Sequence, residues 1–423
     1  MIDTILYHIR KIIPASLFSF AQPAYHFGMA LLGALVYRFP SRSIKIVAVT
    51  GTKGKTSVSE ITNAILEEAG YRTALSNTIR FKVDTVSKDN LYKMSMPGRF
   101  FMQKFLRDAV KAKCDYVVME ATSQGALMKR HKFIDFDALI FTNMAPEHIE
   151  AHGSYENYLE AKLGIARAIA GSKKARRIIV ANADDVESAK FLAPNFTEKL
   201  TYTLADAKPF NLFKEGFAMT VGGVLIKSPL SGEFNIYNEL AAITYTKSQG
   251  VTVEVARNAI EKIEMIRGRV QKIEAGQNFT VVVDYAHTPD SLQKLYNVFK
   301  GTRRICVLGN TGGGRDIWKR DEMALIAENE CDEIILTNED PYDDDPEQIV
   351  TDMAGALTKK TPRVIMDRRE AIATALSLAQ TGDSVLITGK GTDPFIMGPN
   401  NSKIPWSDAE VAREELLKLQ NQA

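Results

Sequence analysis

A glycine-rich loop between an apolar run and a helical stretch constrains the fold of this chain more than any other feature. The loop follows Ile46-Val47-Ala48-Val49, reads Thr50-Gly51-Thr52-Lys53-Gly54-Lys55-Thr56, and precedes a helical stretch at residues 57–69. Glycines let backbone N–H groups curl around phosphate oxygens, and the helix N-terminus adds the positive end of its dipole. Lys55 would neutralise phosphate charge and Thr56 would ligate Mg²⁺. The sequence therefore predicts a nucleoside triphosphate site formed by Gly51, Thr52, Lys53, Gly54, Lys55 and Thr56.

The order of apolar and helical stretches is typical of two α/β domains. Strand-like runs alternate with helices up to about residue 181, Gly222-Gly223 indicates a hairpin, and a helical region at residues 237–264 follows. A second alternation, typical of a doubly wound sheet, then begins. Strands are expected at residues 44–50, 116–121, 138–142, 177–181, 279–283, 304–308, 333–337, 363–366 and 384–388.

The predicted fold class is therefore α/β, in two domains after a short front segment. A central P-loop domain with a mostly parallel sheet is expected at residues 45–267, and a Rossmann-like doubly wound domain at residues 268–423. Residues 1–44 are expected to form the apolar helical segment in front of them.

The front segment is free of charge from residue 12 to residue 37, with basic residues on both sides. Pro14 and Pro23 interrupt it, and the clear stretch at residues 24–37 would span about 21 Å as a helix, short of the roughly 30 Å of a bilayer core. Two interpretations remain open: a helical pair packed on the next domain, or docking of residues 12–37 on a membrane surface.

Composition names no partner and matches an ordinary soluble protein. Hydrophobic residues make up 45% and charged residues 25%, and the net charge of +2 gives no attraction to nucleic acid. Cys114, Cys306 and Cys331 are far apart in sequence and lie in apolar runs. They are expected to be reduced core thiols of a cytoplasmic protein.

The loop departs from the general pattern G-x-x-x-x-G-K-[ST], because Val49 stands where the first glycine would be. This shortened form resembles the Mur ligase superfamily, which includes folylpolyglutamate synthetases. The string Asp284-Tyr285-Ala286-His287-Thr288-Pro289-Asp290 resembles the MurE type in particular. Further matching motifs are Met119 to Gln124 with Arg130, Phe141-Thr142-Asn143, Glu147-His148, His152-Gly153, Tyr158 with Ala161-Lys162, Phe234-Asn235 with Asn238, Arg267-Gly268-Arg269, Gly312 to Asp316 with Lys319-Arg320, and Gly389-Lys390-Gly391.

The resemblance implies an ATP-dependent ligase, in which a carboxylate is activated as an acyl phosphate and then attacked by an amine. It implies two Mg²⁺ ions, one held by Thr56 and Glu120 and a second by His148, with Lys162 carbamylated by CO₂ to face the metal. It also assigns adenine to Asn235 and Asn238, ribose to Asp284 and phosphate to Arg269. The implied catalytic residues are Lys55, Glu120, His148, Lys162 and Arg269. Because Gly153 follows His152 directly, residues 148–152 are expected to be a loop, in which His152 only positions the segment.

The substrate residues of the family are only partly matched. Ser95, Ser123 and Arg130 would bind the acceptor, although Ser95-Met96-Pro97 replaces Thr-Thr-Pro and only about 43 residues stand where a uridine-binding domain is usual. Residues implied for the amino-acid site are Arg315, Glu339, Asp340, Tyr342, Lys390 and Asp393.

The amino-acid motif Asp-Asn-Pro-Arg appears as Glu339-Asp340-Pro341-Tyr342, so the cation for a distal carboxylate is absent from it. The aspartates at residues 343–345 either make the site acidic, which favours lysine or ornithine, or cap a helix beginning near Pro346.

Three functions stay open at this point. The leading hypothesis is a compact MurE-like ligase acting on a cell-wall peptide precursor. The alternatives are a folylpolyglutamate or poly-γ-glutamate type of ligase and a non-catalytic ATP-binding partner subunit. A cytoplasmic location is expected, with membrane association left open.

Overall fold

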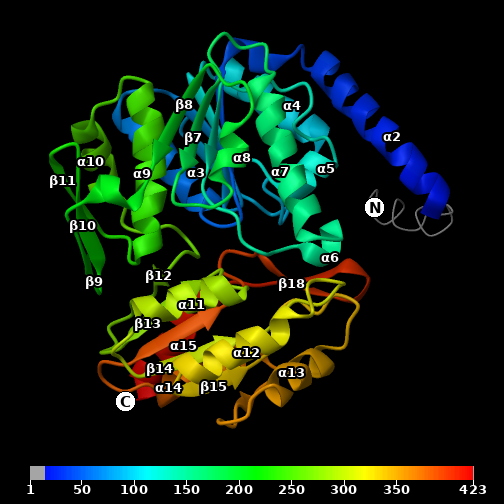
Figure 1. Cartoon of the computed structure of the whole chain (residues 1–423). Coiled ribbons are helices and arrows are strands. Elements are labelled where there is room, and N and C mark those ends of the chain that lie inside the picture. The colour runs from blue at the N-terminus through cyan, green and yellow to red at the C-terminus, as the bar shows by residue number, and fades with distance from the viewer. Residues whose placement is uncertain (1–14, 423) are drawn as a thin grey trace.

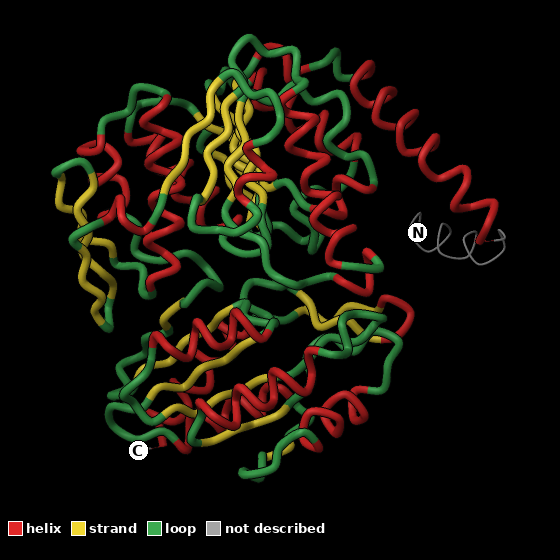
Figure 2. Tube along the Cα trace, viewed as in Figure 1, coloured by secondary structure: helices red, strands yellow, loops and turns green. Residues whose placement is uncertain are grey.

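The computed structural model describes residues 15–422, with two α/β bodies packed one above the other (Figure 1). Each body has a sheet between layers of helices (Figure 2). The predicted fold class, a P-loop domain followed by a doubly wound domain, is confirmed.

The upper body has an eight-stranded sheet in the order β4-β3-β2-β5-β1-β6-β7-β8. Its six strands from β2 to β8 in that order are parallel, while β3 and β4 form an antiparallel edge. The strands are β1 (Lys45–Thr50), β2 (Thr73–Ser76), β3 (Arg80–Val83), β4 (Val86–Asp89), β5 (Tyr116–Glu120), β6 (Ala138–Phe141), β7 (Ile178–Asn182) and β8 (Glu198–Tyr202).

Alternate residues of the central strand β1 enter separate cores on the two faces of this sheet. Val47 and Val49 pack with α3 (Lys55–Glu68) and α9 (Glu233–Ser248), whereas Ile46 and Ala48 pack with α4 (Arg99–Lys111) and α7 (Tyr155–Ala170). A strand buried on both faces reads as a continuous apolar run, which is why it was visible in the sequence. The remaining helices of this body are α5 (Ser123–Leu127), α6 (Ile149–His152), α8 (Ser188–Leu192) and α10 (Val253–Glu261), with short 3₁₀ turns η1 (Pro40–Ser43) and η2 (Leu204–Ala207).

The hairpin predicted at Gly222-Gly223 is present in a small antiparallel sheet of β9 (Phe210–Phe213), β10 (Gly216–Val221) and β11 (Val224–Ser228). Both glycines have positive φ, +56° and +84°, which suits the tight turn between β10 and β11. Phe217, Met219 and Ile226 bury this sheet against the α9 side of the central body.

The lower body has a six-stranded sheet in the order β12-β13-β17-β14-β15-β16, parallel except for β12. The strands are β12 (Gln271–Lys272), β13 (Thr280–Asp284), β14 (Arg304–Leu308), β15 (Glu333–Leu336), β16 (Arg363–Val364) and β17 (Ser384–Thr388). Its helices are α11 (Pro289–Val298), α12 (Lys319–Glu330), α13 (Pro346–Gly355), α14 (Arg368–Leu378) and α15 (Asp408–Gln422), and β18 (Phe395–Gly398), η3 (Pro399–Asn401) and β19 (Ser402–Pro405) complete it. The strands predicted from the sequence match within a few residues.

The front segment contains one long helix, α2 (Ala15–Val36), so the expected helical pair is wrong within the described residues. The helix continues through Pro23, although a proline in a helix interior removes a backbone hydrogen bond and crowds the preceding turn. Packing on the next domain is confirmed for the second half, where Ala30 and Ala34 are buried and Arg107 of α4 donates to the Tyr37 carbonyl at 2.6 Å. Residues 12–14 of the predicted segment lie outside the described residues. Among the helices between residues 15 and 422, none is long and apolar enough to cross a membrane.

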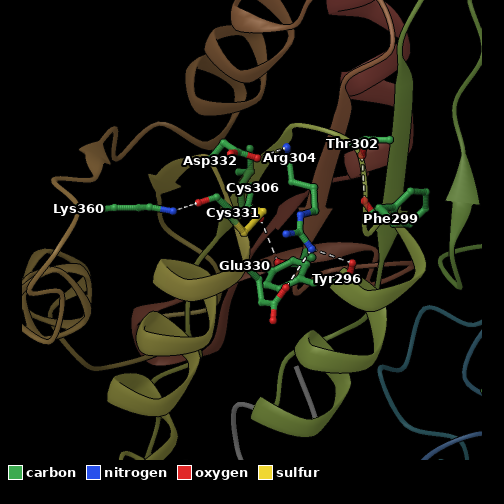
Figure 3. Close-up of a disulfide and its surroundings, with 11 residues drawn as sticks. Tyr296, Phe299, Thr302, Arg304, Cys306, Glu330, Cys331, Asp332 and Lys360 are labelled. Atoms are coloured by element: carbon green, nitrogen blue, oxygen red, sulfur yellow. Dashed lines mark hydrogen bonds and ion pairs between the residues drawn. A yellow bond between two sulfur atoms is a disulfide. The ribbon is translucent and has the colours of Figure 1, made fainter.

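The expectation of three reduced cysteines is wrong for two of them. Cys306 in β14 and Cys331 at the end of α12 form a disulfide (Figure 3). Cys114 is a free buried thiol. The chain leaves β14, passes through α12 and returns into the adjacent parallel strand β15, which brings the two Cα atoms to 6.1 Å. Cysteine spacing along the sequence could not show this proximity.

A buried ion pair joins the last two helices. Arg368 at the start of α14 donates from Nε and Nη2 to the Asp408 carboxylate at 2.8 and 2.7 Å, and also to the Thr388 carbonyl at 2.8 Å. Both side chains are at most 1% exposed. Its neighbour Arg369 pairs with Glu414 and Glu415, but its side chain is 40% exposed.

We predict that Arg368→Met lowers the free energy of unfolding by about 3–5 kcal/mol, since it leaves Asp408 buried without its cation. The matched variant Arg369→Met should cost less than about 1 kcal/mol, because exposed pairs contribute little. Urea denaturation of the full chain measures both values, and equal losses would contradict the prediction.

Candidate active site

The phosphate loop is held in shape by the end of β6. Thr142 Oγ1 donates to the Lys53 carbonyl at 2.6 Å, and the Lys53 amide donates to Asn143 Oδ1 at 3.0 Å. Gly51 has φ +146°, and a Cβ there would lie 2.0 Å from Thr142 Oγ1. Gly54 has φ +84° and immediately precedes α3. Both glycines are therefore required by backbone conformation and close approach, as the loop prediction assumed.

Lys55, Thr56 and Glu120 come together at the first turn of α3. Lys55 Nζ donates to the carbonyls of Gly51 and Thr52 at 2.9 and 2.8 Å, and burial lowers its pKa although Glu120 opposes the shift. Thr56 Oγ1 donates to Glu120 Oε1 at 2.7 Å, and Arg269 from the lower body donates to Thr56 Oγ1 at 3.2 Å. Hydroxyl and carboxylate oxygens are the ligands that Mg²⁺ prefers, so this pair fits the predicted metal beside the phosphates.

His148 and Lys162 lie deeper, beside Tyr158. Tyr158 OH is 3.1 Å from Thr52 Oγ1, and the Lys162 ammonium lies 4.9 Å from the Tyr158 ring centre and donates to the Gly51 carbonyl at 2.7 Å. Burial, followed by repulsion from Lys55, lowers the pKa of Lys162 well below its usual range. Burial also lowers the pKa of His148 to about 4, so its ring is neutral at pH 7 and able to accept a cation.

The segment after His148 is a helical turn rather than the expected loop. His148 and Gly153 both have positive φ, +57° and +81°, and they bracket the four-residue helix α6. The turn directs His152 Nε2 to Ser123 Oγ at 3.1 Å, which agrees with the positioning role expected for His152. Among residues 15–422, no three His, Cys, Asp or Glu side chains gather as a ready metal site.

Contacts between the two bodies converge beside the loop. Glu147 Oε1 lies 3.0 Å from Lys53 Nζ and 3.1 Å from His287 Nε2 of the lower body. Although burial opposes it, Lys53, His148 and His287 hold the pKa of Glu147 well below its usual range. Asp316 accepts the backbone amides of His148 and Glu150 at 2.8 and 3.1 Å. These contacts position the lower body over the phosphate loop.

A cleft of about 1020 Å³ runs between the bodies. Lys55, Thr56, Glu120, His148, Arg269, Asn238 and Asp284 line it, together with Ser95, Ser123 and Arg130, which were predicted for the acceptor, and Arg315, which was predicted for the amino acid. The predicted residues that do not line it include Asn235, Lys162, Glu339, Asp340, Tyr342, Lys390 and Asp393. Asn235 accepts from Asn238 Nδ2 at 2.8 Å, so it orients the amide that does face the cleft. Asp284 is held by the amides of Val270 and Ala286 at 2.6 and 2.7 Å.

The acceptor residues lie on the upper wall of the cleft. Ser95 Oγ donates to Glu120 Oε2 at 2.5 Å, which places it beside the Thr56 and Glu120 pair. Arg130 donates to the Met96 carbonyl, and burial lowers its pKa to about 10. Ser123 is held by His152, so the three predicted residues are brought to the same side.

The predicted amino-acid residues gather beyond the carboxyl ends of β14, β15 and β17 in the lower sheet. Asp340 Oδ1 accepts from Lys390 Nζ at 2.6 Å, and Asp393 Oδ2 lies 3.7 Å from the same ammonium. Arg315 lies over the Tyr342 ring at 5.5 Å and donates to the Tyr342 hydroxyl at 3.3 Å. Glu339 is buried and accepts from Thr311 at 2.8 Å, so it supports the site from below.

The aspartates at residues 343–345 are engaged in local structure. Asp345 is the N-cap of α13 and accepts from the Glu347 amide at 2.9 Å. Asp343 accepts from the Asn400 amide at 2.7 Å, and Asp344 from the Gly313 amide at 3.1 Å. The capping interpretation therefore holds for Asp345, and the carboxylates among the predicted amino-acid residues that pair with lysines are those of Asp340 and Asp393.

Four residues of the site were not assigned a role from the sequence. Glu147, His287 and Asp316 stood within the recognised motifs, but nothing in the motifs showed that they meet across the cleft. Lys93 lay outside every motif, and its salt bridges with Asp340 and Asp393 join residues about 250 and 300 positions apart.

A phosphate loop with oxygen ligands beside it, closed over by a second domain with its own charged pocket, defines a two-domain enzyme that uses a nucleoside triphosphate. The Mur ligase middle domain family matches residues 49–246, and the Mur ligase glutamate ligase domain matches residues 268–391. The chain belongs to the Mur ligase family. It is an ATP-dependent ligase that forms a C–N bond between an acid and an amino acid.

Relatives of the chain are of the MurE type. A UDP-N-acetylmuramyl-tripeptide synthetase of Roseiflexus sp. (strain RS-1) is 36% identical, over 92% of this chain and 82% of the relative. A UDP-N-acetylmuramoyl-L-alanyl-D-glutamate–2,6-diaminopimelate ligase of Syntrophomonas wolfei is 34% identical, over 92% and 81%. A solved structure of a ligase with this last name has a TM-score of 0.59 and 28% identity, covering 89% of this chain and 79% of the other.

Proposed function

We propose that this ligase activates the carboxylate of a cell-wall peptide precursor as an acyl phosphate and joins it to a cationic amino acid. The observation that carries the proposal is the single cleft that brings Ser95 and Arg130, the phosphate loop and Arg315 around one space. An acceptor carboxylate on the upper wall would thus face both the γ-phosphate and the incoming amine. Holding reactants in this way removes much of the entropic cost of reaction.

The cations that line the cleft do most of the chemistry in this arrangement. Negative charge builds on phosphate oxygens when the carboxylate attacks and again when the amine attacks. Lys55 would hold the β- and γ-phosphates from the loop, and Arg269 would reach them from the lower body. Thr56 and Glu120 would hold Mg²⁺, which neutralises phosphate charge when bound. We assign adenine to Asn238, oriented by Asn235, and ribose to Asp284.

Lys162 is the residue whose chemistry differs most from its ordinary form. Its amine is 1% exposed, donates to a loop carbonyl, and has no carboxylate partner among the described residues. The lowered pKa favours the neutral amine, which is the form that attacks CO₂ and releases a proton to give a carbamate. The carbamate would be an anion beside His148, able to face a second Mg²⁺.

We predict that Lys162→Ala lowers kcat by at least about a hundredfold, the order expected when charge stabilisation is removed from the transition state. Added formate or acetate should restore part of the activity by taking the place of the carbamate. The exposed Lys173, which lies beyond the end of α7, provides the control, since Lys173→Ala should leave kcat unchanged. ADP release measures all of these, and full activity of Lys162→Ala would exclude the carbamate.

The charges of the amino-acid site favour lysine or ornithine. Tyr342 replaces the arginine of the family motif, and Asp340 and Asp393 present carboxylate oxygens beside Lys390. Arg315 forms no salt bridge with another described residue, so its guanidinium can donate to the α-carboxylate of the amino acid. A second carboxylate on the amino acid would meet the two aspartates and be repelled.

We predict that ADP release with UDP-N-acetylmuramoyl-L-alanyl-D-glutamate and L-lysine has a kcat/KM at least about tenfold above that with meso-diaminopimelate, because unpaired like charges weaken binding. The acceptor panel should include folate with glutamate, and Lys55→Ala serves as the inactive control. Turnover with folate and glutamate alone would establish the folylpolyglutamate alternative. Absence of turnover with every acceptor would favour the ATP-binding subunit.

The outer face of α2 suggests where in the cell the enzyme works. Tyr25, Leu32, Leu35 and Val36 are each about half exposed, at 57%, 48%, 54% and 57%. The helix lies along the edge of the upper body, away from the lower body (Figure 1). Basic residues border it, namely Arg38, Arg42, Lys129 and Lys132. We assign this face to an anionic membrane surface, which would hold the cytoplasmic enzyme at the bilayer.

We predict that the full chain sediments with vesicles containing phosphatidylglycerol and that Leu32→Ser with Leu35→Ser reduces the bound fraction about fivefold or more, because apolar area drives interfacial binding. Val186→Ser is the matched control, since Val186 is 89% exposed elsewhere on the surface. Equal sedimentation of both variants would contradict the assignment.

A further inference from the structure

Lys93 crosses from the upper body into the amino-acid site of the lower body. It lies in the segment between β4 and α4, and its ammonium is 2.7 Å from Asp340 Oδ2 and 2.9 Å from Asp393 Oδ2. The side chain is 15% exposed, and it lines the cleft. Burial opposes its charge, but Asp393 and Asp340 outweigh burial and raise the pKa of Lys93. The contact is therefore a charged one between two domains.

The two aspartates have a cation of their own without Lys93. Asp340 Oδ1 is occupied by Lys390 Nζ and by the Met397 amide at 2.6 and 2.8 Å, which leaves Oδ2 for Lys93. Asp393 Oδ2 is within 3.7 Å of Lys390 as well. Two carboxylate oxygens thus converge on an ammonium that comes from outside the lower body. An ammonium group of a bound amino acid would need the same two oxygens.

The backbone at Lys93 shows how the residue is held there. Its φ of +52° lies in the left-handed region, which is unfavourable for a lysine. The loop is tied at its start, where Asn90 Nδ2 donates to the carbonyls of Asn77 and Met94 at 2.8 and 3.0 Å. Two positions further on, Ser95 bonds Glu120. Movement of Lys93 would therefore shift Ser95 and its hydrogen bond to Glu120.

We propose that Lys93 is a tethered occupant of the ammonium subsite, which the incoming cationic amino acid must displace in order to bind. This inference rests on the proposed function, because it takes the cluster of Arg315, Asp340 and Asp393 as the amino-acid site. A free amino acid gains a contact that Lys93 cannot make, since its carboxylate pairs with Arg315 while its ammonium takes the aspartates. Lys93 is thus a specificity residue: only an amino acid that carries a side-chain ammonium as well as its α-carboxylate competes well with a group that is already attached.

The opposing interpretation treats Lys93 as a latch that only holds the domains closed. The two interpretations predict opposite changes in the affinity for the amino acid when Lys93 is removed. Removing a competitor strengthens amino-acid binding and leaves ATP binding unchanged, whereas removing a latch weakens the binding of every substrate that needs closure.

The test compares the full-length wild type with Lys93→Met, Lys93→Arg and Lys88→Met. Lys93→Met removes the charge and keeps the apolar stem, Lys93→Arg keeps a cation, and Lys88→Met removes an exposed lysine of β4 that has no ion-pair partner among the described residues. L-lysine is the probe, titrated calorimetrically in the presence of ADP and Mg²⁺, and its KM is measured by ADP release.

Lys93→Met is expected to lower both the Kd and the KM for L-lysine about tenfold, as removal of a tethered competitor at millimolar effective concentration would do. The KM for ATP should stay within about twofold, and Lys93→Arg and Lys88→Met should behave as wild type. An unchanged or higher Kd for L-lysine in Lys93→Met, absence of binding included, would overturn the proposal. Calorimetry needs no turnover, so failure of the proposed function, seen as no ADP release with any acceptor, is separable from failure of this inference.

Discussion

The crowding of lysine side chains around one loop is the constraint on which the rest of this structure depends. Lys53, Lys55 and Lys162 all lie at the phosphate loop, and the pKa values of Lys55 and Lys162 are lowered by burial and by neighbouring lysines. Three lysine side chains gathered at one partly buried loop need either a neutral amine or compensating negative charge. Glu147 provides it for Lys53, and nucleotide phosphates suit Lys55. For Lys162 the carbamate proposed above would supply it on the lysine itself.

The same need for compensation explains how the two bodies meet. Glu147 hydrogen-bonds with His287, and Thr56 accepts a hydrogen bond from Arg269. Asp316 of the lower body accepts one from the backbone amide of His148. Each contact brings a group of the lower body to within a few ångströms of the loop. A site assembled from two domains in this way excludes water and becomes complete only on closure. Lys93 adds a contact in the other direction, because its ammonium extends from the upper body to the carboxylates of Asp340 and Asp393 in the lower body.

The residues that were predictable share a physical property: their function depends on backbone geometry or on short-range order. The phosphate loop needs Gly51 and Gly54 at positive φ, and strand β1, which leads into it, is buried on both faces. By contrast, the disulfide of Cys306 and Cys331 depends on the adjacency of β14 and β15, and the helix through Pro23 shows that a proline does not always end a helix. The aspartates at residues 343–345 were ambiguous for another reason, because helix capping and substrate binding can use the same carboxylate.

By itself, the sequence determined that the chain is an α/β protein with a nucleotide loop between β1 and α3, because glycine conformation and apolar periodicity act over neighbouring residues. It also placed Glu120, His148 and Lys162 at the same site through their motifs. Only the tertiary structure decided which polar and charged groups face each other across the cleft: Glu147 with the imidazole of His287, and Lys93 with Asp340 and Asp393. Electrostatic partners are chosen by distance in space rather than by distance along the chain, and that distance exists only once both sheets have formed and closed on each other.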